Sequence, residues 1–267
     1  MIIVPFDFSK KAITSLDQAL YLSSSSGLAV ELVHITNRAA VREYPRTWNY
    51  SSFDDRYLEN KMNQIVEARI KKLNLNHSVT HTCYVTESVM ISGAIIKRAI
   101  NRKARLLVMG THGFSGAADV LLGSNTSSII NQALIPVLAI PMNWKPKPLM
   151  HVIIAAESNQ ISKYRKIASD WSGLFQCDQE WIEFYYLPDK DQLKKIKEKY
   201  PELKLVKADI LNSLAENLVK YTSKRKNSAL MMFVHQRNLL QKIFNSSITE
   251  NVSGLIKIPL LALPVKK

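Results

Sequence analysis

The sequence lacks the features that mark secreted, metal-binding and membrane-spanning proteins. Only two cysteines occur among its 267 residues, and neither Cys83 nor Cys177 belongs to a CxxC pair or a histidine cluster. A disulfide framework or a zinc site is therefore not expected. No apolar run approaches the roughly 20 residues of a membrane span, and the first residues contain no basic leader with a cleavage site. These absences predict a cytoplasmic protein that has no metal site of its own.

Acidic residues are also scarce relative to basic ones. The 36 Lys and Arg exceed the 22 Asp and Glu by 14, with +5 in residues 1–144 (15 against 10) and +9 in residues 145–267 (21 against 12). Such a surplus brings nucleic acid or an acidic partner into consideration. However, the densest lysine runs, 190–199 and 220–226, have helical spacing with apolar residues between the charges. A solvated helix face explains them at least as well, and we do not expect a nucleic-acid partner.

Three of the glycines between two strand-like apolar runs form a spaced pattern with the serine that follows them. Gly110, Gly113, Gly123 and then Ser124 form the pattern G-x2-G-x9-G-S. Glycine allows positive φ or close approach of a ligand, and the start of a helix offers unpaired N–H groups to an anion. The spacing is neither that of a Walker A loop nor G-x-G-x-x-G. The segment indicates a phosphate-binding loop, although the same glycines would also suit a sharp turn followed by a helix capped by Ser124.

This order of strand, glycines, helix and strand resembles the ATP-binding signature of the universal stress protein family, and it does so from Met109 to Thr126. The start of the chain, Ile2 to Ser9, is similar to that family's first strand and its Asp-containing turn. The resemblance implies an adenine-nucleotide site for ATP, either alone or with Mg²⁺. The cofactor-binding residues that it implies are Pro5, Phe6, Asp7, Ile35, Met109, Gly110, His112, Gly113, Gly123, Ser124, Asn125 and Thr126.

The implied roles have a physical basis. Asp7 can accept hydrogen bonds from ribose hydroxyls or an exocyclic amine, and main-chain N–H groups at Gly123 and Ser124, together with the helix dipole, favour a phosphate. His112 lies within the loop, where it could donate to a phosphate oxygen, although such a histidine is more often simply exposed. No general base, metal-binding carboxylate cluster or activated nucleophile is evident beside the loop. We therefore assign no catalytic residue and expect at most slow ATP hydrolysis.

An internal repeat divides the chain into two halves. A shift of 123 residues aligns 136–141 with 259–264, and a shift of 150 aligns 2–7 with 152–157. Much of the difference between these two shifts can be assigned to a polar, aromatic-rich insertion from Asn37 to Leu58. Its aromatic residues are candidates to stack on a base or to pack on their own domain or on a partner. The linker around residues 143–148 contains prolines that interrupt helices. We expect one domain at 1–143 and a second at 148–267.

Apolar runs alternate with helical periods in both halves. Alternating βα units predict a parallel sheet with helices on both faces. The resemblance implies two tandem Rossmann-like domains of the adenine nucleotide alpha hydrolase type, each with five strands in the order 3-2-1-4-5. The expected strands are 2–5, 29–35, 79–85, 106–109 and 137–140, then 152–155, 182–186, 203–207, 229–234 and 260–263. Further expectations are helices beginning after Ser9 and covering about 62–73, 88–99 and 125–133, with a lysine-rich helix after Asp189.

The second half lacks the glycine pattern. In the shifted alignment the three glycines become Phe233, Gln236 and Ser246, and Asp7 becomes Glu157. Side chains then occupy space that a phosphate would need, so we predict that the second domain is degenerate and binds no nucleotide. Its expected role is to pair with the first domain through the last strands, 137–140 and 260–263.

Two functions follow from these observations. The leading interpretation is an ATP-binding stress-response or regulatory protein with one competent site. The alternative is an interaction scaffold that binds no nucleotide, formed by the tandem domains as a pseudo-dimer. A homodimer and an unidentified protein partner are compatible with both, and binding to a membrane is not expected.

Overall fold

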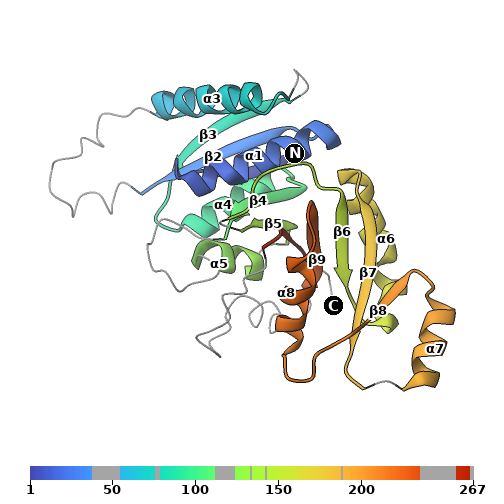
Figure 1. The fold of residues 1–267 in the computed structure, drawn as a ribbon. Helices are drawn as coiled ribbons and strands as arrows, with labels where there is room; N and C mark the ends of the chain where they lie inside the picture. The colour runs from blue at the N-terminus through green and yellow to red at the C-terminus, as the bar shows by residue number, and fades with distance from the viewer. Residues whose placement is uncertain are drawn as a thin grey trace. The chain divides into compact units, whose positions relative to one another are not determined.

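The computed structural model describes residues 1–37, 55–75, 79–111, 124–132, 134–141, 143–187, 189–234 and 257–264. The described residues form two compact units, with the boundary in the sequence between Lys147 and Pro148 (Figure 1). We call the residues before this boundary unit 1 and those after it unit 2. Most of the insertion after the second strand, residues 38–54, lies outside the described ranges, while residues 55–58 already belong to a helix.

Unit 1 contains a parallel sheet whose strands follow the order β3-β2-β1-β4-β5. This is the predicted order 3-2-1-4-5. Its strands are β1 (Ile2–Pro5), β2 (Val30–Thr36), β3 (His81–Glu87), β4 (Leu106–Gly110) and β5 (Val137–Ile140). Ile2, Ile3 and Val4 are completely buried in β1, as expected for a central strand that is covered on both faces.

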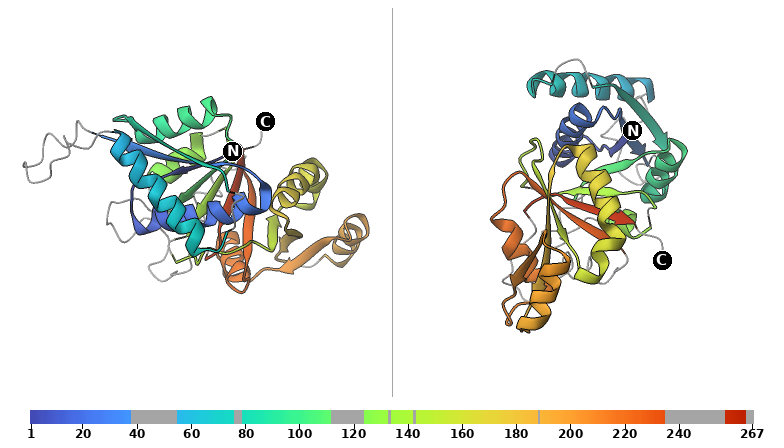
Figure 2. Two further views of the ribbon diagram at one scale, coloured as in Figure 1. Left: turned by 90° about the horizontal axis from the view of Figure 1, so that it is seen from above. Right: turned by 90° about the vertical axis from the view of Figure 1, so that its right-hand side faces the viewer.

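Helices cover both faces of this sheet. They are α1 (Lys10–Ser26), α3 (Asp55–Lys72), α4 (Ile91–Asn101) and α5 (Ser124–Gln132). The Ser9 hydroxyl accepts a hydrogen bond from the Ala12 N–H at 3.1 Å and caps α1, as predicted. Helix α1 packs beside α3, and α4 packs beside α5, which gives one helical layer on each side of the strands (Figure 2).

Buried ion pairs connect these helices to the structure beneath them. The carboxylate of Glu31 on β2 is 1% exposed and accepts two hydrogen bonds from Arg98 of α4, each 2.9 Å long. Arg69 of α3 donates from Nε to Asp17 of α1 at 2.7 Å. Because a buried carboxylate is unfavourable unless it is paired, these contacts fix the positions of both helices.

Unit 2 repeats this architecture with the strand order β8-β7-β6-β9-β10, which again corresponds to 3-2-1-4-5. Its strands are β6 (His151–Ala155), β7 (Asp178–Tyr185), β8 (Leu203–Lys207), β9 (Ser228–Val234) and β10 (Leu260–Pro264). Its helices are α6 (Ile161–Phe175), α7 (Lys190–Lys199) and α8 (Leu214–Ser223), with the short 3₁₀ turn η2 (Ser158–Gln160) before α6. The predicted fold class of two Rossmann-like α/β sheets with flanking helices is therefore confirmed.

The strand registers of the two units correspond residue by residue. Ile2 pairs with Leu106 in unit 1, and Val152 pairs with Ala229 in unit 2, as the shifts of 150 and 123 residues require. The pairs β4–β5 and β9–β10 obey the same shift. Positions at the strand ends of one unit can therefore be compared directly with positions in the other.

Several predicted boundaries were wrong by a few residues. Strand β7 begins at Asp178 rather than residue 182, and β3 covers His81–Glu87 rather than 79–85. Helix α4 begins at Ile91 rather than residue 88, because the Ser88 hydroxyl accepts a hydrogen bond from the Met90 N–H at 3.1 Å and forms a turn before the helix. Within the described ranges, no helix is both long and apolar enough to cross a membrane.

Candidate functional site

The candidate site in unit 1 lies at the edge of the sheet where two neighbouring strands end. Strands β1 and β4 are parallel and pair in register, so Asp7, just after β1, and Gly110, at the end of β4, lie at the same edge. Strand β2, which follows β1 in the chain, lies on one side of β1, and β4 lies on its other side, so the direction of the strand connections reverses between β1 and β4. Ligands of open α/β sheets bind at such a switch point.

The turn after β1 is fixed by hydrogen bonds to β2 and within itself. Phe6 N–H donates to the Val33 carbonyl at 2.8 Å, and His34 Nδ1 donates to the Phe6 carbonyl at 2.7 Å. The Asp7 side chain is exposed and its Oδ1 accepts from the Ser9 N–H at 3.0 Å. This hydrogen bond orients the Asp7 carboxylate at the surface of the turn, where it remains accessible to a ligand.

Phe8 takes an unusual backbone conformation in this turn, with φ of +63°. A bulky residue seldom occupies this left-handed region, which glycine adopts without strain. The Phe8 ring contacts those of Phe6 and His34, with centroids 5.2 and 5.0 Å apart, and Lys61 Nζ lies 5.3 Å from its centre. These contacts hold the Phe8 ring in place against its neighbours.

The N-terminus of α5 is tied to the end of β4 by one hydrogen bond. Thr126, which is 2% exposed, donates from Oγ1 to the Gly110 carbonyl at 2.7 Å. Thr111 N–H donates to the Ile140 carbonyl at 3.0 Å and extends the pairing of β4 with β5. The first turn of α5, which begins at Ser124, therefore lies next to the strand end that neighbours β1. The first N–H groups of a helix have no partner within the helix, and together with the positive end of its dipole they favour an anion.

The structure brings some of the predicted site residues together and leaves others outside its description. Pro5, Phe6 and Asp7 share one edge with the end of β4, and Ile35 lies half-buried near the end of β2. The side chain of Met109 is buried within the sheet. The backbone of Ser124 and Asn125 is part of α5. Residues His112, Gly113 and Gly123 lie outside the described ranges. The aromatic residues of the insertion that were candidates to stack on a base, Tyr44, Trp48 and Tyr50, also lie outside them.

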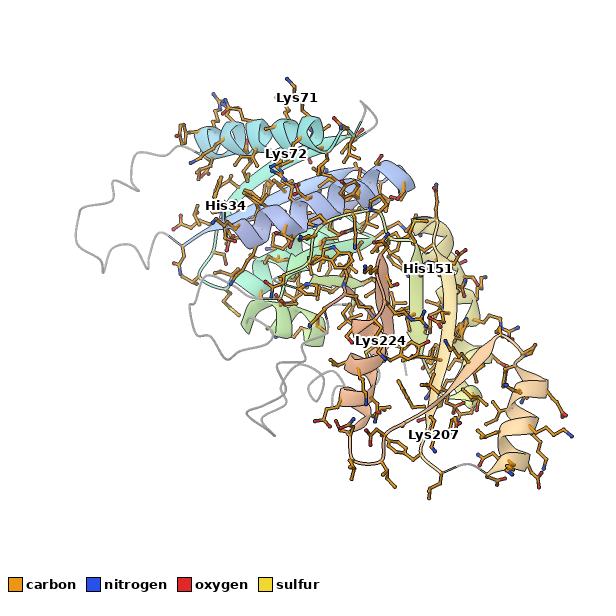
Figure 3. All side chains as sticks on the ribbon, viewed as in Figure 1. His34, Lys71, Lys72, His151, Lys207 and Lys224 are labelled. Atoms are coloured by element: carbon orange, nitrogen blue, oxygen red, sulfur yellow. The ribbon has the colours of Figure 1, made fainter. Side chains whose placement is uncertain are left out.

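Sequence reasoning missed His34 at this edge. The residue lies on β2 (Figure 3), and its hydrogen bond to Phe6 makes Nδ1 the donor, since a carbonyl oxygen only accepts. The neutral ring then presents Nε2 as an acceptor. The available signal was a single histidine within the otherwise apolar run Leu32–Ile35. Among the described residues, no group of three or more His, Cys, Asp and Glu side chains is arranged to hold a metal ion.

Five parallel strands in the order 3-2-1-4-5, covered by helices and carrying a strand-end site at the switch point, define a Rossmann-like α/β protein. The sequence profile of the universal stress protein family matches residues 1–141, and the chain belongs to that family. A universal stress protein of Methanocaldococcus jannaschii is 23% identical over 153 residues, a match that covers 52% of this chain and 93% of that protein.

Solved structures extend the similarity over the whole chain. A universal stress protein from Archaeoglobus fulgidus aligns with a TM-score of 0.61 at 14% identity, covering 98% of this chain and 95% of that one. A functionally unknown protein from Pseudomonas aeruginosa aligns with a TM-score of 0.61 at 12% identity, covering 98% and 92%. At such identities these structures support the fold, and the function has to be argued from the site.

Proposed function

We propose that this protein is a stress-response regulator that binds an adenine nucleotide, with ATP as the expected ligand, at the strand-end site of unit 1. The observation that carries the proposal is the hydrogen bond from Thr126 to the Gly110 carbonyl. It places the N-terminus of α5 beside β4, the strand that pairs with β1 ahead of Asp7. An anion-binding helix start and a carboxylate that can accept from a ribose thus face the same edge of one sheet.

The two ends of a nucleotide have different requirements, and this edge offers a counterpart to each. Helix N-termini bind phosphates through main-chain N–H groups and the helix dipole. The exposed carboxylate of Asp7 suits the hydroxyls of a ribose, because an ionised carboxylate offers several lone pairs beyond the one that Ser9 N–H uses. Mg²⁺ would accompany the phosphates, as it commonly does in nucleotide sites.

Binding without rapid turnover is the expected behaviour. Asp7 in the turn after β1 is assigned to the ribose rather than to the phosphates, and His34 on β2 uses its Nδ1 proton on the Phe6 carbonyl. A general base has to reach the proton that it abstracts. We infer that the nucleotide is retained as a signal and hydrolysed slowly, if at all, and that unit 2 is a degenerate copy that binds no nucleotide.

The test is ATP binding to the whole chain by isothermal titration calorimetry. The double substitution Gly113→Val and Gly123→Val adds two branched side chains to the predicted phosphate loop and should weaken binding at least about tenfold, a difference of about 1.4 kcal/mol. Gly173→Val is the matched control, because a Cβ at Gly173 in α6 meets no atom within 4 Å. This control should bind ATP like the wild type.

Two results would contradict the proposal. The first is an unchanged affinity in the folded double variant, which would remove the glycine loop from the site. The second is a wild-type protein that binds no adenine nucleotide at millimolar concentration and carries none in a native mass spectrum after purification. That outcome would favour the interaction scaffold.

A further inference from the structure

Unit 2 contains a cavity of about 200 Å³ at the carboxyl ends of β6, β7 and β9, bordered by α6 and α8. Its position in the sheet corresponds to the strand-end site of unit 1. The local backbone is also equivalent, because Ala156 N–H donates to the Ile182 carbonyl at 3.1 Å as Phe6 N–H does to Val33. This volume is well above the ~10–15 Å³ that a single water molecule requires, so the cavity has room for a small organic molecule.

Three replacements at equivalent positions give this cavity a chemistry unlike that of unit 1. The shared strand registers identify them as Phe6 to Ala156, His34 to Glu183, and Gly110 to Phe233. The loss of the Phe6 ring opens space at the end of β6. The Phe233 ring stacks on Tyr164 of α6, with centroids 3.9 Å apart and an angle of 12° between the planes. The space beside β9 is thereby converted into an aromatic wall.

The carboxylate of Glu183 has an unsatisfied oxygen. Its Oε1 accepts a long hydrogen bond of 3.5 Å from the Ser158 hydroxyl, whereas Oε2 is buried and has no hydrogen-bond partner within the described part of the chain. A buried polar atom without a partner is unfavourable, and far more so when the group is charged. Such an atom marks a position where a ligand that donates a hydrogen bond would be stabilised.

The charges around the cavity are of one sign. Among the described residues, its lining contains two carboxylates, Glu157 and Glu183, and no Lys, Arg or His. A phosphate would be repelled by these carboxylates, whereas a cation would be attracted. The remaining lining is largely apolar and aromatic, including Ala155, Tyr164 and Phe233, which favours a ligand with an apolar body and one charged end.

We propose that unit 2 binds a small organic cation, an amine or amidine attached to a planar apolar group. The charged N–H groups of the ligand donate to Glu183 Oε2, and its apolar part packs against the Tyr164–Phe233 wall. The same fold would then carry a nucleotide site in one unit and a site for a cation in the other. This proposal uses residues of unit 2 alone and does not depend on the nucleotide site.

Three probes of matched size and shape test the charge requirement on the whole chain. Benzamidine is a cation, benzamide is neutral and benzoate is an anion, and each is titrated while binding is followed by calorimetry and by ligand-observed NMR. The expected order of affinity is benzamidine, then benzamide, with benzoate binding least. Glu183→Gln should weaken benzamidine binding about 10- to 100-fold, the range for a hydrogen bond to a charged group. Glu198→Gln, which removes the same charge from an exposed position outside the cavity lining, should leave it unchanged.

A second variant keeps the proposal falsifiable if Glu183→Gln fails to fold. Ala156→Phe restores the side chain of unit 1 and fills the cavity, and it should abolish benzamidine binding while Glu183 remains in place. Binding that survives both substitutions would overturn the proposal. So would benzoate or ATP binding to the cavity as tightly as benzamidine, or the absence of benzamidine binding at millimolar concentration.

Discussion

The Thr126→Val substitution tests whether one hydrogen bond positions the phosphate-binding end of α5. Valine has nearly the same shape as threonine, so the change replaces the Oγ1 atom with a methyl group and leaves the packing intact. Thr126 is 2% exposed, and its hydroxyl lies 2.7 Å from the Gly110 carbonyl. The substitution therefore removes a buried donor from that carbonyl without creating a cavity.

The size of the effect follows from this geometry. A hydrogen bond contributes about 0.5–1.5 kcal/mol net when water replaces the lost partner, whereas a buried acceptor left unpaired costs about 1–3 kcal/mol in all. We expect a loss of about 1–2 kcal/mol, which corresponds to roughly 2–8 °C in melting temperature for a domain of this size. ATP affinity should fall about fivefold for each kcal/mol by which the helix start is destabilised.

The assays are thermal unfolding, amide hydrogen exchange across α5 and ATP calorimetry. Thr126→Ser retains the hydroxyl and should stay close to the wild type in all three. Thr14→Val is the matched control, since the Thr14 hydroxyl bonds at 3.0 Å to the Lys10 carbonyl of its own helix, on an exposed face. It should change stability by no more than about 0.5 kcal/mol. The reasoning fails if Thr126→Val melts and binds ATP like the wild type, or if Thr126→Ser is equally damaged.

Two further predictions concern the interior of the protein. Arg98→Met should destabilise unit 1 by about 2–4 kcal/mol in urea unfolding. The substitution removes one of the two arginines that pair with the buried Glu31 carboxylate in the described structure and leaves Arg102, at 3.0 Å. A loss below about 0.5 kcal/mol would contradict the importance of the Arg98–Glu31 pair. Burial raises the pKa of Cys83 to about 12 and that of Cys177 to about 11. A raised pKa favours the neutral thiol, so at pH 8 about a thousandth of Cys177 or less is thiolate and iodoacetamide should modify both residues only after unfolding. Rapid alkylation of the native protein would refute this.

Most of the fold could be predicted from the sequence because its central strands are buried on both faces. Such strands appear as continuous apolar runs, and Ile2–Pro5, Leu106–Gly110 and Val137–Ile140 were all recognised in this way. The repeated Ala-Ile-Pro and Ala-Leu-Pro endings supplied the alignment of the two halves. The strand registers then obeyed that alignment.

The start of strand β7 could not be predicted from the local sequence pattern. Its first residues, starting at Asp178, are largely polar, and the expected strand began only at residue 182. Glu180 belongs to the strand because its carboxylate accepts hydrogen bonds from Tyr221 at 2.6 Å, Arg225 at 2.8 Å and Lys204 at 3.2 Å. These partners lie 24 to 45 residues away in sequence, so a short window of sequence does not show that the charge is compensated.

The candidate site could likewise be predicted only in part from the sequence. The meeting of Asp7 and Gly110 at one edge follows from topology, and the sequence was enough to predict it. The hydrogen bonds made by Thr126 and His34 depend on side-chain directions that no spacing rule specifies. In the second half, the expectation that larger side chains would fill the site considered Phe233 and overlooked Ala156, whose small size leaves room beside the stacked rings.

The matching registers of the two sheets have a consequence for how this chain can change over time. Because main-chain pairing supports each scaffold independently of the residues at the strand tips, one copy can alter its ligand without endangering the architecture of either. Duplication of a single gene segment would thus have supplied two scaffolds in the same polypeptide, one for the proposed nucleotide site and one for the proposed cation site. Each chain would then carry one site for each of two chemically different ligands.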